Sequence, residues 1–392
     1  MARRNGGFIG TDGLDAPDPP TAITPTIGDA QVSVAFTAPS DVGASAITGF
    51  VAQVSINDTD YSAGSNTGTS SPIVVSSLTN FTASTVKVWA INAFGTSAPS
   101  AASASFSPAI SRGVYAGGTT SSILNVIQYI DINTTGNTTD FGDLTEIKRG
   151  AAPMSSNTRG LFGGGYSSAQ SKAIDYITIA NTGNAADFGD LTVTGSQIGG
   201  VSNSTRGVAI GGDGRTAVID YVTIASLGNG TDFGDCTNSE NQAGASSSTR
   251  GVFASPGGGS LLIHYITIGT TGNETDFGNL SIGRGSMAGM SSGTRGLFSG
   301  GNTYVTTIDY VTIANTGNAT DFGDLTVGRR TPSGTSSPVR GVTMGGSNSS
   351  GTLQNIIDYI TMASTGNASD FGDLTEAIKT ASAISSNHGG LQ

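Results

Sequence analysis

The sequence predicts an all-β protein in which a small antiparallel sandwich precedes an array of six similar repeats. Three observations predict this class. Only 11 % of the 392 residues are charged and 59 are glycine, a composition that favours short strands and tight turns over helices. Runs with alternating apolar residues recur from residue 31 onward. Close variants of TGNATDFGD (316–324) occur six times after residue 130.

The charge balance excludes two classes of partner. The chain carries 17 Lys and Arg against 28 Asp and Glu, a net charge of -11. A nucleic-acid-binding protein needs clustered cations to neutralise phosphates, so we expect no nucleic-acid partner and no binding to an anionic membrane surface. No apolar run approaches the roughly 18 residues needed to span a bilayer, so we expect no membrane insertion.

The N-terminal residues 1–17, which begin MARRNGGFIG, are polar and lack periodicity. They contain no apolar core segment, so they do not have the pattern of a secretory signal, and we expect an extended anchoring arm. Cys236 is the single cysteine, which excludes an internal disulfide and provides no thiolate metal cluster. We therefore expect a fold stabilised by packing and backbone hydrogen bonds, without cofactor or metal.

Residues 18–108 show the alternation of a β-sandwich. The run QVSVAFTAP (31–39) places Val32, Val34 and Phe36 on one face, and the runs at 47–56 and 84–95 alternate likewise. AFTAPSD, Leu78 and VKVWAINAFGTSAPS (86–100) resemble a fibronectin type III domain. The resemblance implies a spacer or binding module. The chain departs from that family at Phe36, where the family has Trp, and at Ser84, which falls on its tyrosine-corner position.

The rest of the chain is a repeat. One unit reads S-x-T-R-G, an apolar strand ending in Gly-Gly, a variable loop, I-D-Y-I-T-I and T-G-N-x-T-D-F-G-D-L-T, with the Phe of DFGD spaced 44 to 49 residues apart. We expect the repeated Arg and Phe to be structural. The arginines are Arg112, Arg159, Arg206, Arg250, Arg295 and Arg340, and the phenylalanines are Phe141, Phe188, Phe233, Phe277, Phe322 and Phe371.

Residues 109–392 predict a six-bladed β-propeller. Each copy holds three or four short strand-like segments and no helical period, and its length matches one propeller blade. The double glycine and the later aromatic resemble kelch-type blades, with the Phe of DFGD in place of the family's late Trp. ISSNHGGLQ (384–392) aligns with MSSNTRGLF (154–162). We therefore expect the C-terminal strand to complete the first blade and close the ring, which removes an exposed sheet edge.

The repeated polar residues admit a structural and a functional interpretation. We expect each repeated Arg to pair with the Asp of a DFGD segment, the alternative being a ring of cations that lines a binding channel. We expect the Tyr of IDYITI to pack between blades, the alternative being a sugar-stacking platform. We expect TGN to form a turn, since Gly and Asn tolerate positive φ, the alternative being a calcium site.

Catalysis has little support in the sequence. His264 and His388 are the only histidines, and no nucleophile elbow, P-loop or HExxH motif occurs. We expect no enzymatic activity. A glycan-degrading enzyme that brings two distant carboxylates together is the alternative.

Binding specificity is expected where the six copies differ most, in the loops after Gly-Gly and in the stretches after DFGDL. A scaffold that repeats while its loops diverge places recognition in the loops. The aromatic and cationic residues of these stretches are expected at the surface as the candidate binding residues. They are Tyr166, Arg215, Arg284, Tyr304, Arg329 and Arg330.

The repeated sequence motifs of residues 111–392, together with the short leader and the fibronectin-like domain, are similar to those of virion structural proteins of tailed bacteriophages. The resemblance implies a non-enzymatic tail, fibre or capsid-decoration protein, made in the host cytoplasm and anchored to other virion proteins by residues 1–17. Its propeller would bind a host-surface glycan or protein, or another virion protein. An extracellular glycan-binding adhesin is the alternative. The sequence leaves open whether the chain forms a homo-oligomer.

Overall fold

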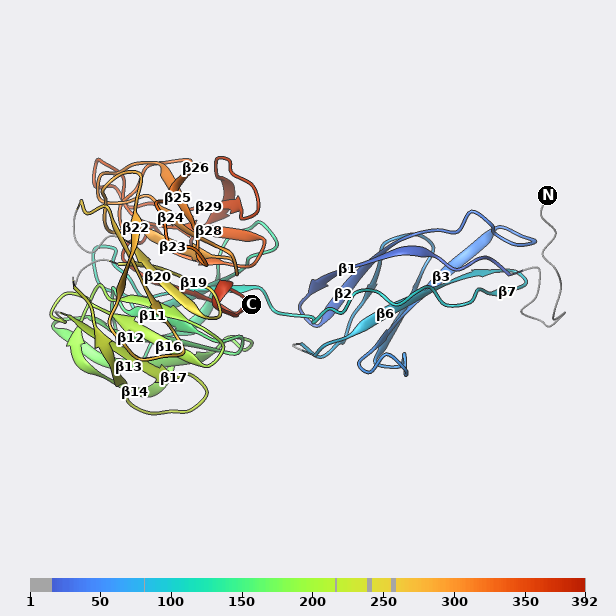
Figure 1. Cartoon of the computed structure of the whole chain (residues 1–392), viewed down its shortest axis with the longest axis horizontal. Coiled ribbons are helices and arrows are strands. Elements are labelled where there is room, and N and C mark those ends of the chain that lie inside the picture. The colour runs from blue at the N-terminus through green and yellow to red at the C-terminus, as the bar shows by residue number, and fades with distance from the viewer. Residues whose placement is uncertain (1–15, 81, 216, 238–241, 255–258, 392) are drawn as a thin grey trace. The chain divides into compact units, whose positions relative to one another are not determined.

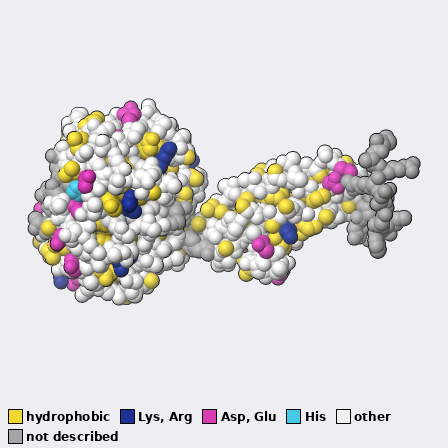
Figure 2. Space-filling view, in the orientation of Figure 1, with side chains coloured by type: hydrophobic (Ala, Val, Ile, Leu, Met, Phe, Trp, Pro, Cys, Tyr) yellow, Lys and Arg dark blue, Asp and Glu magenta, His cyan; other side chains and the backbone are white. Residues whose placement is uncertain are grey.

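A computed structural model describes residues 16–80, 82–215, 217–237, 242–254 and 259–391. The chain divides into two compact units, Met1–Ile110 and Ser111–Gln392, both built from β-strands (Figure 1). The all-β class predicted from composition is confirmed. Figure 2 shows few charged side chains on the face in view, which is mostly uncharged, in keeping with the composition. Of the predicted arm 1–17, residues 1–15 lie outside the described residues.

The first unit consists of two antiparallel sheets, with strand orders β1-β2-β5 and β4-β3-β6-β7. The alternating runs found in the sequence at 31–39, 47–56 and 84–95 correspond to β2, β3 and β6. The strands are β1 (Thr21–Gly28), β2 (Gln31–Thr37), β3 (Ile47–Ser55), β4 (Gly64–Gly68), β5 (Ile73–Val75), β6 (Thr85–Asn92) and β7 (Gly95–Thr96).

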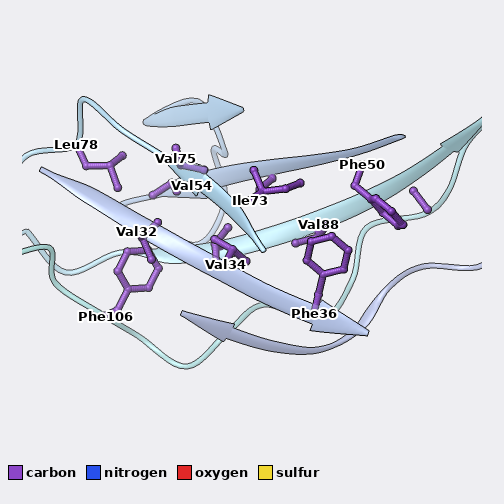
Figure 3. Close-up of a cluster of buried hydrophobic side chains, with 13 residues drawn as sticks. Val32, Val34, Phe36, Phe50, Val54, Ile73, Val75, Leu78, Val88 and Phe106 are labelled. Atoms are coloured by element: carbon purple, nitrogen blue, oxygen red, sulfur yellow. The ribbon is translucent and has the colours of Figure 1, made fainter. Parts of the chain in front are cut away.

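The core of the first unit lies between these two sheets. Figure 3 shows Val32, Val34 and Phe36 of β2 directed into one cluster of buried side chains, because alternate residues of a strand share a face. The ring of Phe36 lies 4.8 Å from that of Phe50 on β3, centroid to centroid. The strand that carries Phe36 is thereby joined to the opposite sheet by a direct aromatic contact.

Three serines hold the segment after β7 against β6. Ser97, Ser100 and Ser103 each donate their backbone N–H to a β6 carbonyl oxygen. The side-chain oxygen of each serine accepts the N–H of the same β6 residue. The β6 partners are Ala90, Val88 and Val86, in that order. The segment therefore satisfies the hydrogen-bonding groups along the edge of β6 through serines spaced three residues apart. A search for the two-residue alternation of strands does not find this pattern.

The second unit contains six four-stranded antiparallel sheets, which we number 1 to 6. Sheet 1 has the order β10-β9-β8-β31, and sheets 2 to 6 follow the chain from β11 to β30. In every sheet the TRG, IDYIT and DFG segments of the repeat form three adjacent strands.

The strand bounds of the first three sheets are as follows. Sheet 1 contains β8 (Arg112–Ala116), β9 (Val126–Asp131), β10 (Thr139–Asp143) and β31 (Ser382–Ser385). Sheet 2 contains β11 (Ala152–Ser155), β12 (Arg159–Tyr166), β13 (Gln170–Thr178) and β14 (Ala186–Gly195). Sheet 3 contains β15 (Gly199–Ser202), β16 (Arg206–Ile210), β17 (Val218–Thr223) and β18 (Thr231–Asp235).

The other three sheets repeat this pattern. Sheet 4 contains β19 (Ala243–Ser246), β20 (Arg250–Ala254), β21 (Leu262–Thr267) and β22 (Thr275–Asn279). Sheet 5 contains β23 (Ala288–Ser291), β24 (Arg295–Ser299), β25 (Thr307–Thr312) and β26 (Thr320–Asp324). Sheet 6 contains β27 (Ser333–Ser336), β28 (Arg340–Met344), β29 (Ile356–Thr361) and β30 (Ser369–Asp373), and a 3-10 helix, η1 (Gly389–Leu391), follows β31.

Sheet 1 combines strands from both ends of the second unit. β31 pairs with β8 in antiparallel register from Ser382 opposite Ala116 to Ser385 opposite Gly113. The first strands of neighbouring sheets contact each other in the order β11, β15, β19, β23, β27 and β31, and β31 also contacts β11.

A β-bulge at the Phe of each DFG segment directs its side chain into the core. In sheet 3, for example, Ile219 faces Gly234 and Asp220 faces Asp232, so Phe233 has no partner in the ladder. The six phenylalanines are buried, and each makes an edge-to-face contact with the Tyr of its own sheet at centroid distances of 5.9 to 6.1 Å.

The repeated arginines bridge neighbouring sheets, and the ion pair expected with the Asp of DFGD does not form. Arg112 in sheet 1 donates from Nη1 to the carbonyl oxygen of Ile179 in sheet 2 at 2.8 Å, and its guanidinium lies 4.3 Å above the Tyr129 ring. A guanidinium stacked on this ring directs its N–H groups to the next sheet's backbone instead of the DFGD carboxylates. The equivalent bonds join Arg159 to Ile224, Arg206 to Ile268, Arg250 to Ile313, Arg295 to Met362 and Arg340 to Ile132.

The TGN turns connect the same neighbours. Asn184 Oδ1 in sheet 2 accepts the N–H of Asp143 in sheet 1 at 3.0 Å. Gly142 approaches this turn so closely that a Cβ on it would lie 2.5 Å from the carbonyl oxygen of Gly183. Only glycine fits there, which explains the Gly of DFG. The same asparagine bond forms at the five other junctions, from Asn229, Asn273, Asn318, Asn367 and Asn137.

Candidate functional site

The six binding residues predicted from the variable loops separate into two groups. Three of them, expected at the surface, are fully buried, and that expectation is wrong: Arg215, Arg284 and Arg329. The other three line one cavity: Tyr166, Tyr304 and Arg330. The variable stretches therefore hold both core and surface positions.

Each buried arginine neutralises the Asp of an IDY segment. A buried carboxylate without a partner is energetically costly, so a cation has to accompany it. These arginines are buried because they meet this requirement. Burial lowers the pKa of Arg284, and the carboxylate of Asp309 opposes this effect. The pairs are Arg215–Asp220 at 3.0 Å, Arg284–Asp309 at 2.9 Å and Arg329–Asp358 at 2.6 Å, and Lys148–Asp175 at 3.1 Å repeats the arrangement.

Arg215 reaches its aspartate from a different place in the repeat. Lys148, Arg284 and Arg329 each stand seven residues after the Phe of DFG, where the second copy has Gly195. A Cβ on Gly195 would lie 2.3 Å from Cδ of Arg215. In the other copies a cation from the connection after the DFG strand fills this space. Here the Arg215 side chain, which comes from the loop after Gly-Gly, fills it.

The two sheets without this Asp change its partner as well. In sheet 1 Gln128 replaces the Asp, and Ile378 stands at the position of the cation. In sheet 4 His264 replaces it, and its Nδ1 lies 2.7 Å from Oε1 of Glu274. The hydrogen bond with Glu274 raises the pKa of His264. Paired changes of this kind between the repeats are a sequence signal for the buried pairs.

The cavity that holds Tyr166, Tyr304 and Arg330 has a volume of about 470 Å³, and we call it the basin. The loops after Gly-Gly in sheets 2, 3, 5 and 6 line it together with connections between sheets, and the corresponding loop of sheet 4 includes residues 255–258, outside the described residues. Arg149, Lys379 and Asp213 also line it, and these three residues were not predicted.

The basin's cations share one position of the repeat. Arg149, Arg330 and Lys379 each stand eight residues after the Phe of DFG, just before the first strand of a sheet. Arg149 and Tyr166 exchange backbone hydrogen bonds at 3.1 and 2.9 Å, and Arg330 exchanges two with Ser347 at 2.9 Å. The backbone of this position is therefore fixed while its side chain is free to differ. Alignment of the repeats on the DFG Phe would have found all three.

The basin is electropositive in an acidic protein. Among the described residues, Arg149, Arg330 and Lys379 form no ion pair. The guanidinium of Arg149 lies 5.1 Å above the Tyr166 ring, which holds it by a cation–π contact. Asp213 is the carboxylate in the lining, and it is exposed. Such a cavity favours anionic groups.

Tyr304 has an unusual backbone in this lining. Its φ is +56°, a left-handed conformation that is uncommon for an aromatic residue. Its N–H donates to the carbonyl oxygen of Gly301 at 2.8 Å. A Cβ on Gly328 would lie 2.1 Å from the Tyr304 carbonyl oxygen, so the following strand connection approaches Tyr304 closely. Local strain maintained by close packing is typical of functional positions.

A second cavity, of about 160 Å³, adjoins the basin and shares Gln197, Thr331 and Thr380 with it. It follows the first strands of the sheets to their other ends, where His388 lines it. A Cβ on Gly390 would lie 1.8 Å from the carbonyl oxygen of Ser202, so the C-terminal residues pack tightly there. Burial lowers the pKa of His388 to about 4. The six repeated arginines do not line either cavity.

No family model matches this chain, and no curated protein matches it. Among the described residues, no three His, Cys, Asp or Glu side chains gather as a metal site. The helix search over the same residues finds none long and apolar enough to cross a membrane. The basin's own residues are therefore the basis for interpreting its function.

Proposed function

We propose that this chain is a non-enzymatic virion structural protein that binds a host-surface or virion ligand through the basin. Its second unit would be a six-bladed β-propeller closed by the C-terminal strand. The first unit would be a fibronectin type III-like spacer, and residues 1–17 would attach the chain to other virion proteins.

The contacts between sheets 6 and 1 support a closed propeller. Arg340 in sheet 6 donates to the Ile132 carbonyl oxygen in sheet 1 at 3.1 Å, and Asn137 accepts the N–H of Asp373 at 3.0 Å. These are the same two bonds that join every other pair of neighbouring sheets. A closed ring uses one junction six times and leaves no sheet edge to pair with another chain.

The strand orders β1-β2-β5 and β4-β3-β6-β7 support a fibronectin-like first unit, since a sandwich of three and four antiparallel strands is the arrangement of that family. The serines Ser97, Ser100 and Ser103, which cover β6, fall in the segment that resembles the end of such a domain. A compact sandwich of this kind suits a spacer.

The observation that carries the binding role is the gathering of residues from several variable loops in one basin. Tyr166 and Tyr304 belong to different repeats and differ from the residues at the same positions in other repeats, whereas Arg330 shares its position with Arg149 and Lys379. A structural frame does not require variable side chains to gather in one place, whereas a binding site combines side chains from several loops in one cavity.

The proposal is tested on purified phage particles. Mass spectrometry is expected to detect the chain in them at a fixed ratio to the capsid protein. A chain without residues 1–17 is expected to fold with an unchanged melting temperature but to be absent from particles. Normal incorporation of the shortened chain would refute the role of the arm, and absence of the full chain from particles would refute the virion role.

An extracellular adhesin is the second candidate, because the basin would serve a glycan-binding protein equally well. Cell fractionation separates the two: an adhesin would be found on the producing cell's surface or in its medium, in the absence of particles.

A further inference from the structure

We infer that the basin binds an acidic saccharide, a sugar chain that bears carboxylate or sulfate groups. This inference rests on the proposed binding function and names the chemical class of the ligand.

The distribution of cations in residues 111–392 carries the inference. This stretch contains fourteen Lys and Arg residues. Six of them bridge neighbouring sheets through backbone carbonyl oxygens, and four neutralise buried aspartates. Lys172 forms an exposed ion pair with Asp190 at 3.1 Å. The remaining three are Arg149, Arg330 and Lys379, and all three line the basin.

The three cations stand on neighbouring connections between strands. They precede β11, β27 and β31, the first strands of sheets 2, 6 and 1, and β31 contacts both other strands. Every other cation of the second unit has a structural partner in the protein. Cations whose side chains make no hydrogen bond or ion pair among the described residues, collected in one cavity of a protein with net charge -11, point to an anion supplied from outside.

The remaining lining favours a saccharide over a uniform polyanion. Tyr166 and Tyr304 offer aromatic surface for the faces of sugar rings, and Gln197 and Ser347 offer hydrogen-bonding groups for hydroxyls. Asp213, which pairs by backbone bonds with Ser196, places a carboxylate in the same cavity. A carboxylate accepts hydrogen bonds from sugar hydroxyls but repels closely spaced phosphates. The mixture suits a ligand with both hydroxyl and acidic groups.

Titration of the full chain with defined polysaccharides tests the inference. The probes are dextran sulfate and polygalacturonate as acidic saccharides, neutral dextran as the backbone-matched control, and single-stranded DNA as an acidic polymer of another class. At low salt we expect binding to at least one acidic saccharide, no binding to dextran and much weaker binding to DNA. Raising the salt concentration should weaken binding, because exposed charges are screened.

Variants locate the site. Arg149→Ala, Arg330→Ala and Lys379→Ala should each weaken binding about fivefold, the effect of one exposed charge contact, and the triple variant should abolish it. Lys172→Ala removes a cation outside the basin and should bind like the unmodified chain. Because none of the three side chains makes a hydrogen bond or ion pair in the described structure, and Arg149 has only its cation–π contact with Tyr166, melting temperatures should change little.

The outcomes separate the two proposals. Equal binding of dextran or DNA, or undiminished binding by the triple variant, would overturn the acidic-saccharide inference. A chain found in particles but indifferent to all acidic saccharides would overturn this inference alone. Binding that depends on the three cations, by a chain absent from particles, would support the inference and refute the virion role.

Discussion

Arg340 in sheet 6 donates a hydrogen bond to the carbonyl oxygen of Ile132 in sheet 1 and stacks 4.5 Å above the ring of Tyr359. The two bonded residues belong to the last and first sheets of the second unit, yet their contact has the geometry of every internal junction. Each sheet is therefore held by its neighbours in the same way, whether they adjoin it along the chain or not.

Arg340→Ala should destabilise the second unit by about 1 to 2 kcal/mol, through loss of one hydrogen bond from a charged group and one cation–π contact. Arg206→Ala is the matched control, since Arg206 makes the same two contacts with Ile268 and Tyr221 within the array. Chemical denaturation should give similar losses for both. A loss at Arg206 with none at Arg340 would show that sheets 6 and 1 separate in solution.

Removing β31 should destabilise the unit far more than any point substitution. A chain that ends at Thr380 leaves the β8 edge unpaired and takes away a neighbour of both β11 and β27. We expect a lower melting temperature and concentration-dependent association through the free edge. A synthetic peptide covering residues 381–392 should reverse both effects, and a truncated chain as stable as the full one would contradict the role of β31.

Substitution of one partner of a buried pair should be more harmful than substitution of both. Arg284→Ile leaves Asp309 buried without its cation and should cost about 3 to 5 kcal/mol. Adding Asp309→Gln recreates the Gln128 and Ile378 combination of sheet 1 and should recover part of the loss. Urea denaturation of the two single variants and the double variant gives the coupling energy. Simple additivity would contradict a direct pair.

The His264–Glu274 pair should make stability depend on pH. The folded-state pKa of His264 is raised, so its contribution is fully present below its ordinary value of 6.5 and is lost as pH rises through the raised value. The pKa of Glu274 is lowered, so its contribution is present above its ordinary value of 4.5 and is lost as pH falls through the lowered value.

The pair should therefore stabilise the fold most between about pH 4.5 and 6.5. NMR titration of the His264 ring should give a pKa above 6.5 in the unmodified chain. Glu274→Gln should bring it down, because the hydrogen bond that His264 donates to the Glu274 carboxylate is the principal cause of the shift. An unchanged His264 pKa in this variant would assign the shift to another group.

The repeat made much of the second unit predictable. The strand positions and the supply of β31 to sheet 1 follow from alignment of the six copies, because the frame residues perform the same local role each time. The partners of the repeated arginines could not be predicted, because they are carbonyl oxygens of the next sheet. Every residue has a backbone carbonyl, so the sequence does not indicate which one accepts the bond.

The candidate site was predictable only in part. Sequence variation marked Tyr166, Tyr304 and Arg330, but it equally marked Arg215, whose position varies because one copy supplies its buried cation from another loop. Arg149 and Lys379 stand at the same place in the repeat as Arg330, eight residues after the DFG Phe, and only alignment of the copies on that Phe shows it. Whether a loop arginine is exposed depends on whether the core has room for its side chain. Gly195, which has no side chain, leaves that room for Arg215.

The pairing of β8 with β31 also sets an order of assembly. During translation β8 leaves the ribosome before the strands of the five other sheets, and its partner emerges after all of them. The growing chain thus carries an unsatisfied strand edge throughout the synthesis of the second unit, a stage at which such edges are prone to mispairing. Pairing of β31 with β8 is the step that satisfies this edge.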